Sequence, residues 1–237
     1  MREINLSKVF YFYTRSLPYL RVTFLYVTVS LVLGFLLGAV VAKGKMNRHR
    51  VVSLLAEAYV TIVRCTPSVI LLFLVFYGLP AMVGGTVQKW INGLPVIVFV
   101  ILTFTVFIGA SSSEIIRGAY ESVNRGQREA GLSAGLTEGQ TLLHIILPQM
   151  LKNSIANIGN TVIFLIKEGA LAYTIGLRDV MGEAYFLSGR DLNAYALSMY
   201  VALTLIYWPL TILLEKTFQW MEKRMVYSHE VRWKNEH

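Results

Sequence analysis

The chain has 237 residues, of which 55% are hydrophobic and 15% are charged, and its formal net charge is +8 at pH 7. This composition excludes an ordinary water-soluble domain, because so apolar a chain must expose hydrophobic surface to lipid. The single cysteine, Cys65, excludes an intrachain disulfide.

The positions of the basic residues indicate whether the positive charge serves a membrane or nucleic acid. More than half of the 22 Lys and Arg residues fall between the apolar runs, in 43–50, in 117–152 and in the tail from residue 216. The positive-inside rule describes this distribution for cytoplasmic segments. We therefore predict an all-α polytopic membrane protein, a single transmembrane domain over 1–237, with five transmembrane helices and no nucleic-acid partner.

The first apolar stretch follows a mixed segment. Residues 1–21 combine aromatic and basic side chains and lack the cleavage site of a secretory signal, so we predict an interfacial segment. Residues 22–42 carry no charge and are long enough to cross about 30 Å of hydrocarbon as a helix. The basic loop 43–50 contains GAVVAKGKM, which departs from a nucleotide-binding loop in glycine spacing and in Met46. We expect no ATP hydrolysis by this chain.

A second span is predicted over residues 53–79, and it contains Glu57 and Arg64. These two side chains share a helix face but lie about 10 Å apart along the axis, too far for a direct ion pair. Two interpretations of Arg64 stay open: it braces another helix or reaches the interface, or it lines a translocation path. Pro67 frees a backbone carbonyl that can line a polar cavity.

The turn-rich segment 79–95 is predicted to be an external loop, and 96–113 to be the third span. Glu114 and Arg117 follow at the end of that span. Their i,i+3 spacing predicts a structural ion pair worth a few tenths of a kcal/mol.

Residues 118–150 form a polar stretch between two apolar runs. Gly135 is suited to the left-handed conformation that ends a helix, and Thr137 with Gln140 predicts a capping box that begins a second one. Two short helices around a glycine also describe a DNA-binding helix-turn-helix, but the adjacent membrane spans argue against that interpretation. A plain solvated loop is the other alternative.

The fourth span is predicted over 153–177 and the fifth over 192–214, with 178–193 outside. Lys167 and Glu168 are adjacent in the fourth span, so they point in different directions and need partners on other helices or on a second subunit. Five spans and a cytoplasmic basic tail place the C-terminus in the cytoplasm and the N-terminus outside.

The polar stretch carries a spaced motif. Glu129-Ala130-Gly131, three residues, Gly135, nine residues and then Ile145-Ile146-Leu147-Pro148 resemble the E-A-A-x3-G-x9-I-x-L-P signature of membrane subunits of binding-protein-dependent ABC importers. Gly131 departs from the usual second alanine. The stretches 59–80, 109–131 and 147–171 resemble the polar amino acid permease branch, which includes histidine, glutamate, glutamine, arginine and cystine permeases.

The resemblance implies a type I ABC importer fold in a bacterial cytoplasmic membrane. Two permease subunits, identical or paralogous, would form the passage, two separate ATPase subunits would bind ATP-Mg, and an external binding protein would deliver a polar amino acid. This chain would bind no cofactor or metal. The ATPase-coupling residues would be Glu129, Ala130, Gly131, Gly135, Ile145, Leu147 and Pro148. The candidates for the translocation path or subunit contact are Arg64, Thr66, Pro67, Glu114, Lys167 and Glu168.

Other classes were compared with this interpretation. The sequence has no H-E-x-x-H motif, and Gly109-Ala110-Ser111-Ser112 lacks the second glycine of a G-x-S-G protease motif, so no catalytic constellation is predicted. An ion-gradient-driven secondary transporter stays an alternative, although five spans do not offer the two matching halves that such folds usually show. An ABC importer of a non-amino-acid solute is the other alternative.

Overall fold

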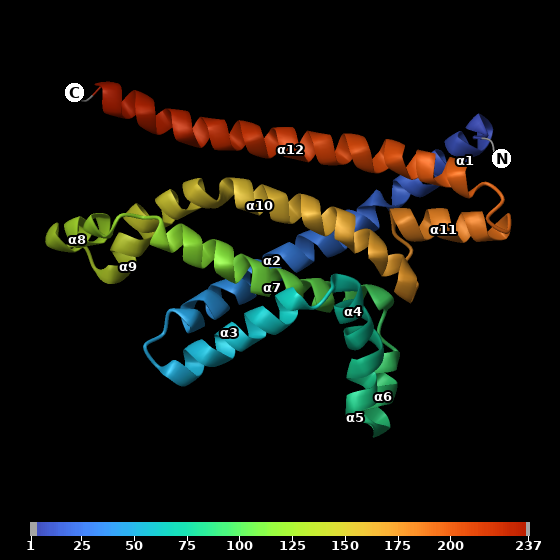
Figure 1. Cartoon of the computed structure of the whole chain (residues 1–237), viewed down its shortest axis with the longest axis horizontal. Coiled ribbons are helices and arrows are strands. Elements are labelled where there is room, and N and C mark those ends of the chain that lie inside the picture. Colours follow the sequence, from blue (N-terminus) through green and yellow to red (C-terminus); the bar gives the residue numbers. More distant parts are fainter. Residues whose placement is uncertain (1–3, 236–237) are drawn as a thin grey trace.

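The predicted all-α fold is confirmed. The structure is a computed structural model that describes residues 4–235, with side chains described as far as residue 225, and no strand occurs within that range. Four described helices are long and apolar enough to cross a membrane, and a bent helix pair makes a fifth candidate span. These long helices run roughly along the long axis of the molecule (Figure 1).

The described part of the chain is a succession of helices and short helical turns. The first part of the chain forms α1 (Leu6–Ser16), η1 (Leu17–Tyr19), α2 (Leu20–Lys45), α3 (Arg50–Cys65), α4 (Ser68–Phe73), η2 (Leu74–Gly78), α5 (Leu79–Val83) and α6 (Gly85–Asn92). The second part forms α7 (Val96–Glu121), α8 (Arg125–Ser133), α9 (Glu138–Thr141), η3 (Leu142–Ile146), α10 (Leu147–Gly169), η4 (Ala170–Ile175), α11 (Val180–Arg190) and α12 (Ala196–Asn235). η1 and η4 are 3₁₀ turns, and η2 and η3 are π-helical turns.

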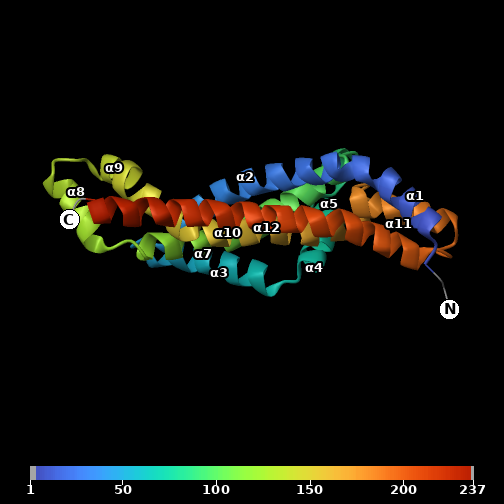
Figure 2. The ribbon, with the colours of Figure 1, turned by 90° about the horizontal axis from the view of Figure 1, so that it is seen from above.

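The two ends of the bundle differ. α8, α9 and the C-terminal end of α12 lie at one end, whereas α1 and α11 lie at the other (Figures 1 and 2). The basic loop between α2 and α3 lies toward the end that holds α8 and α9. The segments predicted to be cytoplasmic are therefore grouped on one side of the bundle.

The first predicted span, 22–42, belongs to a longer rod. α1, η1 and α2 form one apolar helical segment of 40 residues, Leu6–Lys45. Pro18 lies at the start of η1, where its missing N–H is tolerated, so the chain stays helical through it. The segment predicted to be interfacial is therefore, from Leu6 onward, the first part of this helical segment. The buried side chains of α1 pack against α11 and α12.

The second predicted span, 53–79, is not one straight helix. Arg50–Cys65 and Ser68–Val83 meet at an angle of 107°. Thr66 has an extended backbone, with φ −93° and ψ 124°, because the ring of Pro67 disfavours a helical conformation in the preceding residue. The predicted span over 53–79 therefore contains a sharp bend, which lies at the proline that the sequence had singled out.

The third and fourth predicted spans lie within longer helices, α7 and α10 with η4. The fifth, predicted over 192–214, begins only at Ala196. Leu192 and Asn193 adopt positive φ angles of 49° and 59°, so a turn separates α11 from α12.

Residues 178–193, predicted to be an external loop, contain the buried helix α11. Val180, Ala184 and Leu187 recur on one helical face and are buried against α1 and α12. The Asp179 side chain caps the helix by accepting a hydrogen bond of 2.9 Å from the Gly182 N–H. The glycines and charges in this stretch had favoured a loop, whereas burial of the apolar face stabilises a helix.

The centre of the bundle is the close contact between α2 and α7. A Cβ atom added at Gly38 would lie 2.0 Å from Ser112 Oγ, and one added at Gly34 would lie 2.6 Å from the side chain of Ile108. Ser112 Oγ donates a 3.2 Å hydrogen bond to the Gly34 carbonyl. Small residues on both helices allow the two backbones to approach, as is usual in membrane bundles.

Candidate functional site

The polar stretch folds into two short helices that project from one end of the bundle. We define the 125–146 unit as α8, α9 and η3 with their connections (Figure 1). α8 ends in a Schellman motif: the Gly135 N–H donates to the Leu132 carbonyl at 3.0 Å, and the Leu136 N–H donates to the Gly131 carbonyl at 3.1 Å. Gly135 has φ +86°, the left-handed conformation that its position predicted.

The second helix begins with the predicted capping box. Gln140 N–H donates to Thr137 Oγ1 at 3.3 Å, and Thr137 N–H donates to Gln140 Oε1 at 2.9 Å. Reciprocal bonds of this kind satisfy two backbone donors that a helix start leaves free. The predicted start of the second helix is confirmed.

The two short helices are held together by close packing and by one ion pair. A Cβ atom added at Gly131 would lie 2.8 Å from Thr141 Cγ2 and 2.9 Å from Ile145 Cδ1. Arg128 on α8 forms an ion pair with Glu138 on α9, with Nε donating to Oε2 at 3.1 Å. Gly131 is therefore a contact point between helices, a role that the low helix propensity of glycine alone does not indicate.

A small core anchors the unit to the end of α7. Ile146 and Met150 pack on Ala119, with Ile116 and Tyr120 beside them. α7 and α10 both continue into the bundle, so the unit is joined to the ends of two long helices.

The predicted coupling residues divide into two groups. Gly131 and Ile145 lie at the contact between the short helices. The remaining five are exposed on the unit or at the start of α10: Glu129, Ala130, Gly135, Leu147 and Pro148. A cavity of about 620 Å³ beside them is lined in part by Arg125, Arg128 and Glu129.

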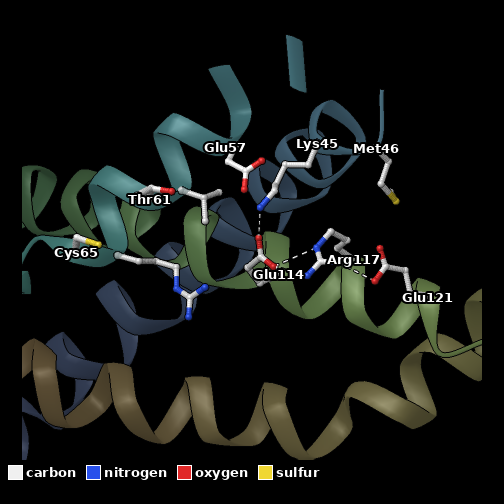
Figure 3. Close-up of a pocket in the computed structure, with 10 residues that line it drawn as sticks. Lys45, Met46, Glu57, Thr61, Cys65, Glu114, Arg117 and Glu121 are labelled. Carbon is white, nitrogen blue, oxygen red and sulfur yellow. Dashed lines mark hydrogen bonds and ion pairs between the residues drawn. The ribbon is translucent and has the colours of Figure 1, made fainter. Parts of the chain in front are cut away.

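A cluster of charged side chains lies farther along the bundle (Figure 3). Glu114 on α7 forms an ion pair with Lys45 at the end of α2, and its other oxygen accepts a 2.9 Å hydrogen bond from Arg117. Arg117 also donates to Glu121 at 2.7 Å. The predicted Glu114–Arg117 pair is confirmed. Lys45 was missed because it is distant in sequence and only the packing of α2 on α7 brings it near.

This cluster lines one side of a cavity of about 840 Å³. Glu57 and Arg64 from α3 line the same cavity, and Figure 3 shows the Glu57 carboxylate directed toward the Lys45–Glu114 pair. The structure gives no direct ion pair between Glu57 and Arg64, as their spacing predicted. The cavity therefore presents carboxylates and cations on opposing helices.

A second cavity of about 380 Å³ adjoins the first, because Arg64 and Glu114 line both. Its other polar side chains come from α7 and α10: Ser111, Asn157, Asn160 and Thr161. The amides were not singled out from the sequence, since uncharged polar residues within an apolar helix give a weak signal. The polar stripe at 157, 160 and 161 is the pattern that could have indicated them.

The other predicted path residues are not brought together. Thr66 bonds its own helix, donating to the Ile62 carbonyl at 2.7 Å, and Pro67 forms the bend. Glu168 accepts a hydrogen bond from Ser68 on α4, as the need for a partner on another helix had predicted. Lys167 is exposed, and the described part of the chain offers it no carboxylate partner.

Metal binding finds no support in the described residues, where no group of three or more His, Cys, Asp or Glu side chains has suitable geometry. Lys45, Glu114, Arg117 and Glu121 are joined by ion pairs, whereas Glu57 and Arg64 line the cavities without one, and the amides of Asn157 and Asn160 lie on the side of α10. Such an arrangement can bind a small polar solute through charge and hydrogen bonds.

Comparison with known proteins identifies the class. Residues 30–227 match the family described as binding-protein-dependent transport system inner membrane component, and the chain belongs to this family. This membership disfavours the gradient-driven alternative.

Individual relatives agree with the family. The chain is 35% identical over 207 residues to the L-cystine transport system permease protein TcyL of Bacillus subtilis, covering 87% of this chain and 85% of that protein. It is 32% identical over 206 residues to the arginine transport system permease protein ArtQ of the same organism, covering 87% and 90%.

Solved structures give the same result for the fold. A crystal structure of an amino acid ABC transporter with histidines superimposes with a TM-score of 0.76 at 27% identity, covering 94% of this chain and all of that one. An inward-facing MetNI methionine ABC transporter superimposes with a TM-score of 0.65 at 20% identity, covering 87% and 92%.

Proposed function

We propose that the chain is the membrane subunit of an ATP-driven importer for a polar amino acid. Two copies, or this chain and a paralogue, form the passage, two separate ATPase subunits bind ATP-Mg and dock on the 125–146 unit, and an external binding protein delivers the solute. The relatives' names support the solute class, since they include cystine and arginine transport systems. The observation that carries the proposal is the capped, exposed 125–146 unit at the end of a membrane bundle.

The orientation follows from charge. The basic loop after α2, the 125–146 unit and the basic end of α12 lie toward one end of the bundle (Figure 1). The positive-inside rule assigns that end to the cytoplasm of a bacterial cell, with the N-terminus outside. ATPase subunits then reach the unit from the cytoplasm, and ATP hydrolysis takes place on them.

The two adjoining cavities are the proposed passage. Arg64 and Glu114 line both cavities, so a solute that moves from one to the other meets both side chains. A free amino acid carries a carboxylate and an ammonium group. A guanidinium binds a carboxylate through two parallel hydrogen bonds, and a carboxylate such as that of Glu57 accepts hydrogen bonds from an ammonium group. Of the two interpretations of Arg64, this arrangement favours the translocation path.

Coupling follows the connectivity of the helices. When ATP binding draws the ATPase subunits together, the docked unit moves, and its core contact with Ala119 passes that displacement to α7. Glu114 and Arg117 lie on the last two turns of the same helix. A shift of α7 therefore changes the position of the charged side chains that line the passage.

Gly135 tests the proposal. Its φ of +86° is strained for any residue with a Cβ atom, although no atom lies within 4 Å of that position. The Gly135→Val variant should misplace the joint between α8 and α9 at a cost of about 1–2 kcal/mol, which corresponds to a roughly tenfold loss of the native arrangement. Gly139→Val is the matched control, because Gly139 also has open surroundings but no positive φ.

The measurement uses the assembled transporter in proteoliposomes with its ATPase subunits and binding protein. We expect Gly135→Val to reach the membrane normally and to lower uptake per ATP hydrolysed, whereas Gly139→Val transports like the wild type. Normal uptake by Gly135→Val would refute the proposed coupling role.

Cystine, arginine and glutamine are then compared as stimulators of ATP turnover. Uptake that persists when the membrane potential is collapsed and ATP is kept excludes a gradient-driven mechanism.

A further inference from the structure

An apolar groove lies between α2, α7 and α10, and none of its lining residues is charged. It encloses about 460 Å³, and Ser154 is the one polar residue among those that line it. Representative lining residues are Val32, Leu36, Ala39, Ala119, Leu147 and Ile158. The groove therefore fits a hydrocarbon and offers almost nothing to a polar solute.

The one hydroxyl in the groove is already used. Ser154 donates hydrogen bonds to the Met150 carbonyl at 2.8 Å and to the Leu151 carbonyl at 3.3 Å, both within its own helix. A ligand in the groove gains no strong hydrogen bond from it. Binding there depends on apolar contact alone.

The length and depth of the groove match one leaflet of a bilayer. From Leu147 to Ile158, the α10 side extends about 16 Å at 1.5 Å per residue, and half of a hydrocarbon layer is about 15 Å thick. The lining comes from the last part of α2, the end of α7 and the start of α10. The groove thus lies in the half of the membrane nearest the basic loop and the 125–146 unit.

Lys43 lies one turn beyond the groove-lining residues of α2. Lys43 follows Ala39 by four residues and Leu36 by seven, so it continues the stripe of α2 that lines the groove. Lys43 is exposed, and no carboxylate lies within ion-pair distance of it among the described side chains. By contrast, Lys45 is paired with Glu114. A lysine at the end of a span extends its ammonium group to the head-group region.

We propose that the groove holds an acyl chain of an anionic phospholipid from the surrounding bilayer, with Lys43 binding its phosphate. Lys43 is unpaired and follows an apolar groove about as long as one leaflet, so an anionic lipid is favoured over a neutral one. A helix from a second copy of this chain is disfavoured by size. A helix of this length, about 10 Å across with its side chains, occupies roughly 1,200 Å³, well above the volume of the groove.

The test uses photoactivatable phosphatidylglycerol, with a diazirine at mid-chain, in proteoliposomes of the full transporter. Illumination should crosslink this lipid to residues 32–39 and 147–158. Ala39→Trp fills the groove and should reduce crosslinking to 147–158 by roughly tenfold, the change expected when about 1.4 kcal/mol of binding is lost. Val40→Trp is the matched control, because Val40 is the next residue of α2, is 70% exposed and does not line the groove.

The head-group contact is tested by competition. In the wild type, unlabelled phosphatidylglycerol should displace the probe better than phosphatidylcholine, and Lys43→Gln should reduce this preference roughly fivefold, as for loss of one basic residue at a membrane surface. Equal crosslinking by Ala39→Trp and the wild type would overturn the proposal, as would equal competition by the two lipids. Dissociation of permease subunits in Ala39→Trp with lipid crosslinking unchanged would instead assign the groove to a second copy of the chain.

Discussion

The two ends of the bundle are stabilised in different ways. At one end, the 125–146 unit is formed by hydrogen bonds between residues only a few positions apart, such as Thr137 with Gln140. At the other end, α11 packs between α1 and the start of α12. Contacts there join opposite ends of the chain: Lys8 pairs with Asp191 at 2.6 Å, and Asn5 N–H donates to Ser198 Oγ at 3.0 Å.

The 125–146 unit is therefore expected to move more easily than α11. The exposed short helices depend on caps worth about 1 kcal/mol each, so the unit can shift without exposing a large apolar core. α11 is buried with a cluster that includes Phe12, Met199 and Ile206. Moving it would expose those side chains to water, at roughly 25 cal/mol for each Å² of apolar surface. Under the proposed function, motion would enter at the first end and be resisted at the second.

The largest effect on stability is expected at Gly182 in α11. A Cβ atom there would lie 1.9 Å from the Leu177 carbonyl oxygen. Gly182→Ala should therefore destabilise the docking of α11 by about 3 kcal/mol and lower the thermal unfolding midpoint of the purified protein. Gly189→Ala in the same helix is the control, because no atom lies within 4 Å of its added Cβ. Equal midpoints for the two variants would show that α11 is not tightly fixed.

A second effect concerns pH at the same end. Desolvation by burial raises the pKa of Asp179 to about 6, although a backbone hydrogen bond from Gly182 and the Tyr26 hydroxyl oppose the shift. Since the folded-state pKa lies above the unfolded value of about 3.8, stability is greatest below about pH 4 and falls as pH rises through about 6. The loss amounts to about 2–3 kcal/mol.

Asp179→Asn tests this expectation, because an asparagine oxygen can still accept the hydrogen bond from Gly182. Thermal unfolding of the wild type should become easier between about pH 4 and about pH 6, and the variant should lack this dependence. If both proteins follow the same pH curve, Asp179 does not carry the effect. Asp179→Ala serves as the reference for loss of the helix cap.

A smaller and local effect is expected at the 125–146 unit. Thr137→Ala removes one half of the capping box and should weaken α9 locally by about 1 kcal/mol, while leaving the unfolding midpoint of the bundle unchanged. Hydrogen exchange of the backbone amides at 138–141 should accelerate roughly fivefold. Thr137→Ser retains the hydroxyl and should exchange like the wild type. A lowered global midpoint would show that the unit is part of the main cooperative core.

The smallest effect is expected for the exposed ion pair between Arg128 and Glu138. The two side chains are 46% and 64% exposed, so solvent and salt screen their attraction. A double-mutant cycle with both alanine variants should give a coupling free energy of about 0.5 kcal/mol or less, measured by the same hydrogen exchange. A larger value that resists added salt would indicate that the pair fixes the angle between α8 and α9.

The sequence predicted those features whose cause is local. Four features depend on residues within a few positions of one another: the all-α fold class, the left-handed conformation of Gly135, the capping box and the Glu114–Arg117 ion pair. Pro67 itself accounts for the position of the bend, but the angle of 107° depends on how α4 and α5 pack. The coupling and passage roles of the candidate residues remain predictions.

Features that join distant residues could not be predicted in this way. Lys45 became part of the charged cluster only because small residues allow α2 and α7 to approach. Glu168 has its partner Ser68 on a helix far away in sequence. Periodicity assigns a residue to a face of its own helix, but it does not say which other helix that face meets.

The amino-acid sequence alone predicts a helical membrane protein with two short polar helices between its spans. Hydrophobic run length, glycine conformation and side-chain caps act over one or two helical turns, so they are encoded in neighbouring residues. Helix packing buries α11, brings charged side chains into one cavity and forms the apolar groove between α2, α7 and α10. These features depend on which surfaces pack together, and that choice is made by the whole bundle.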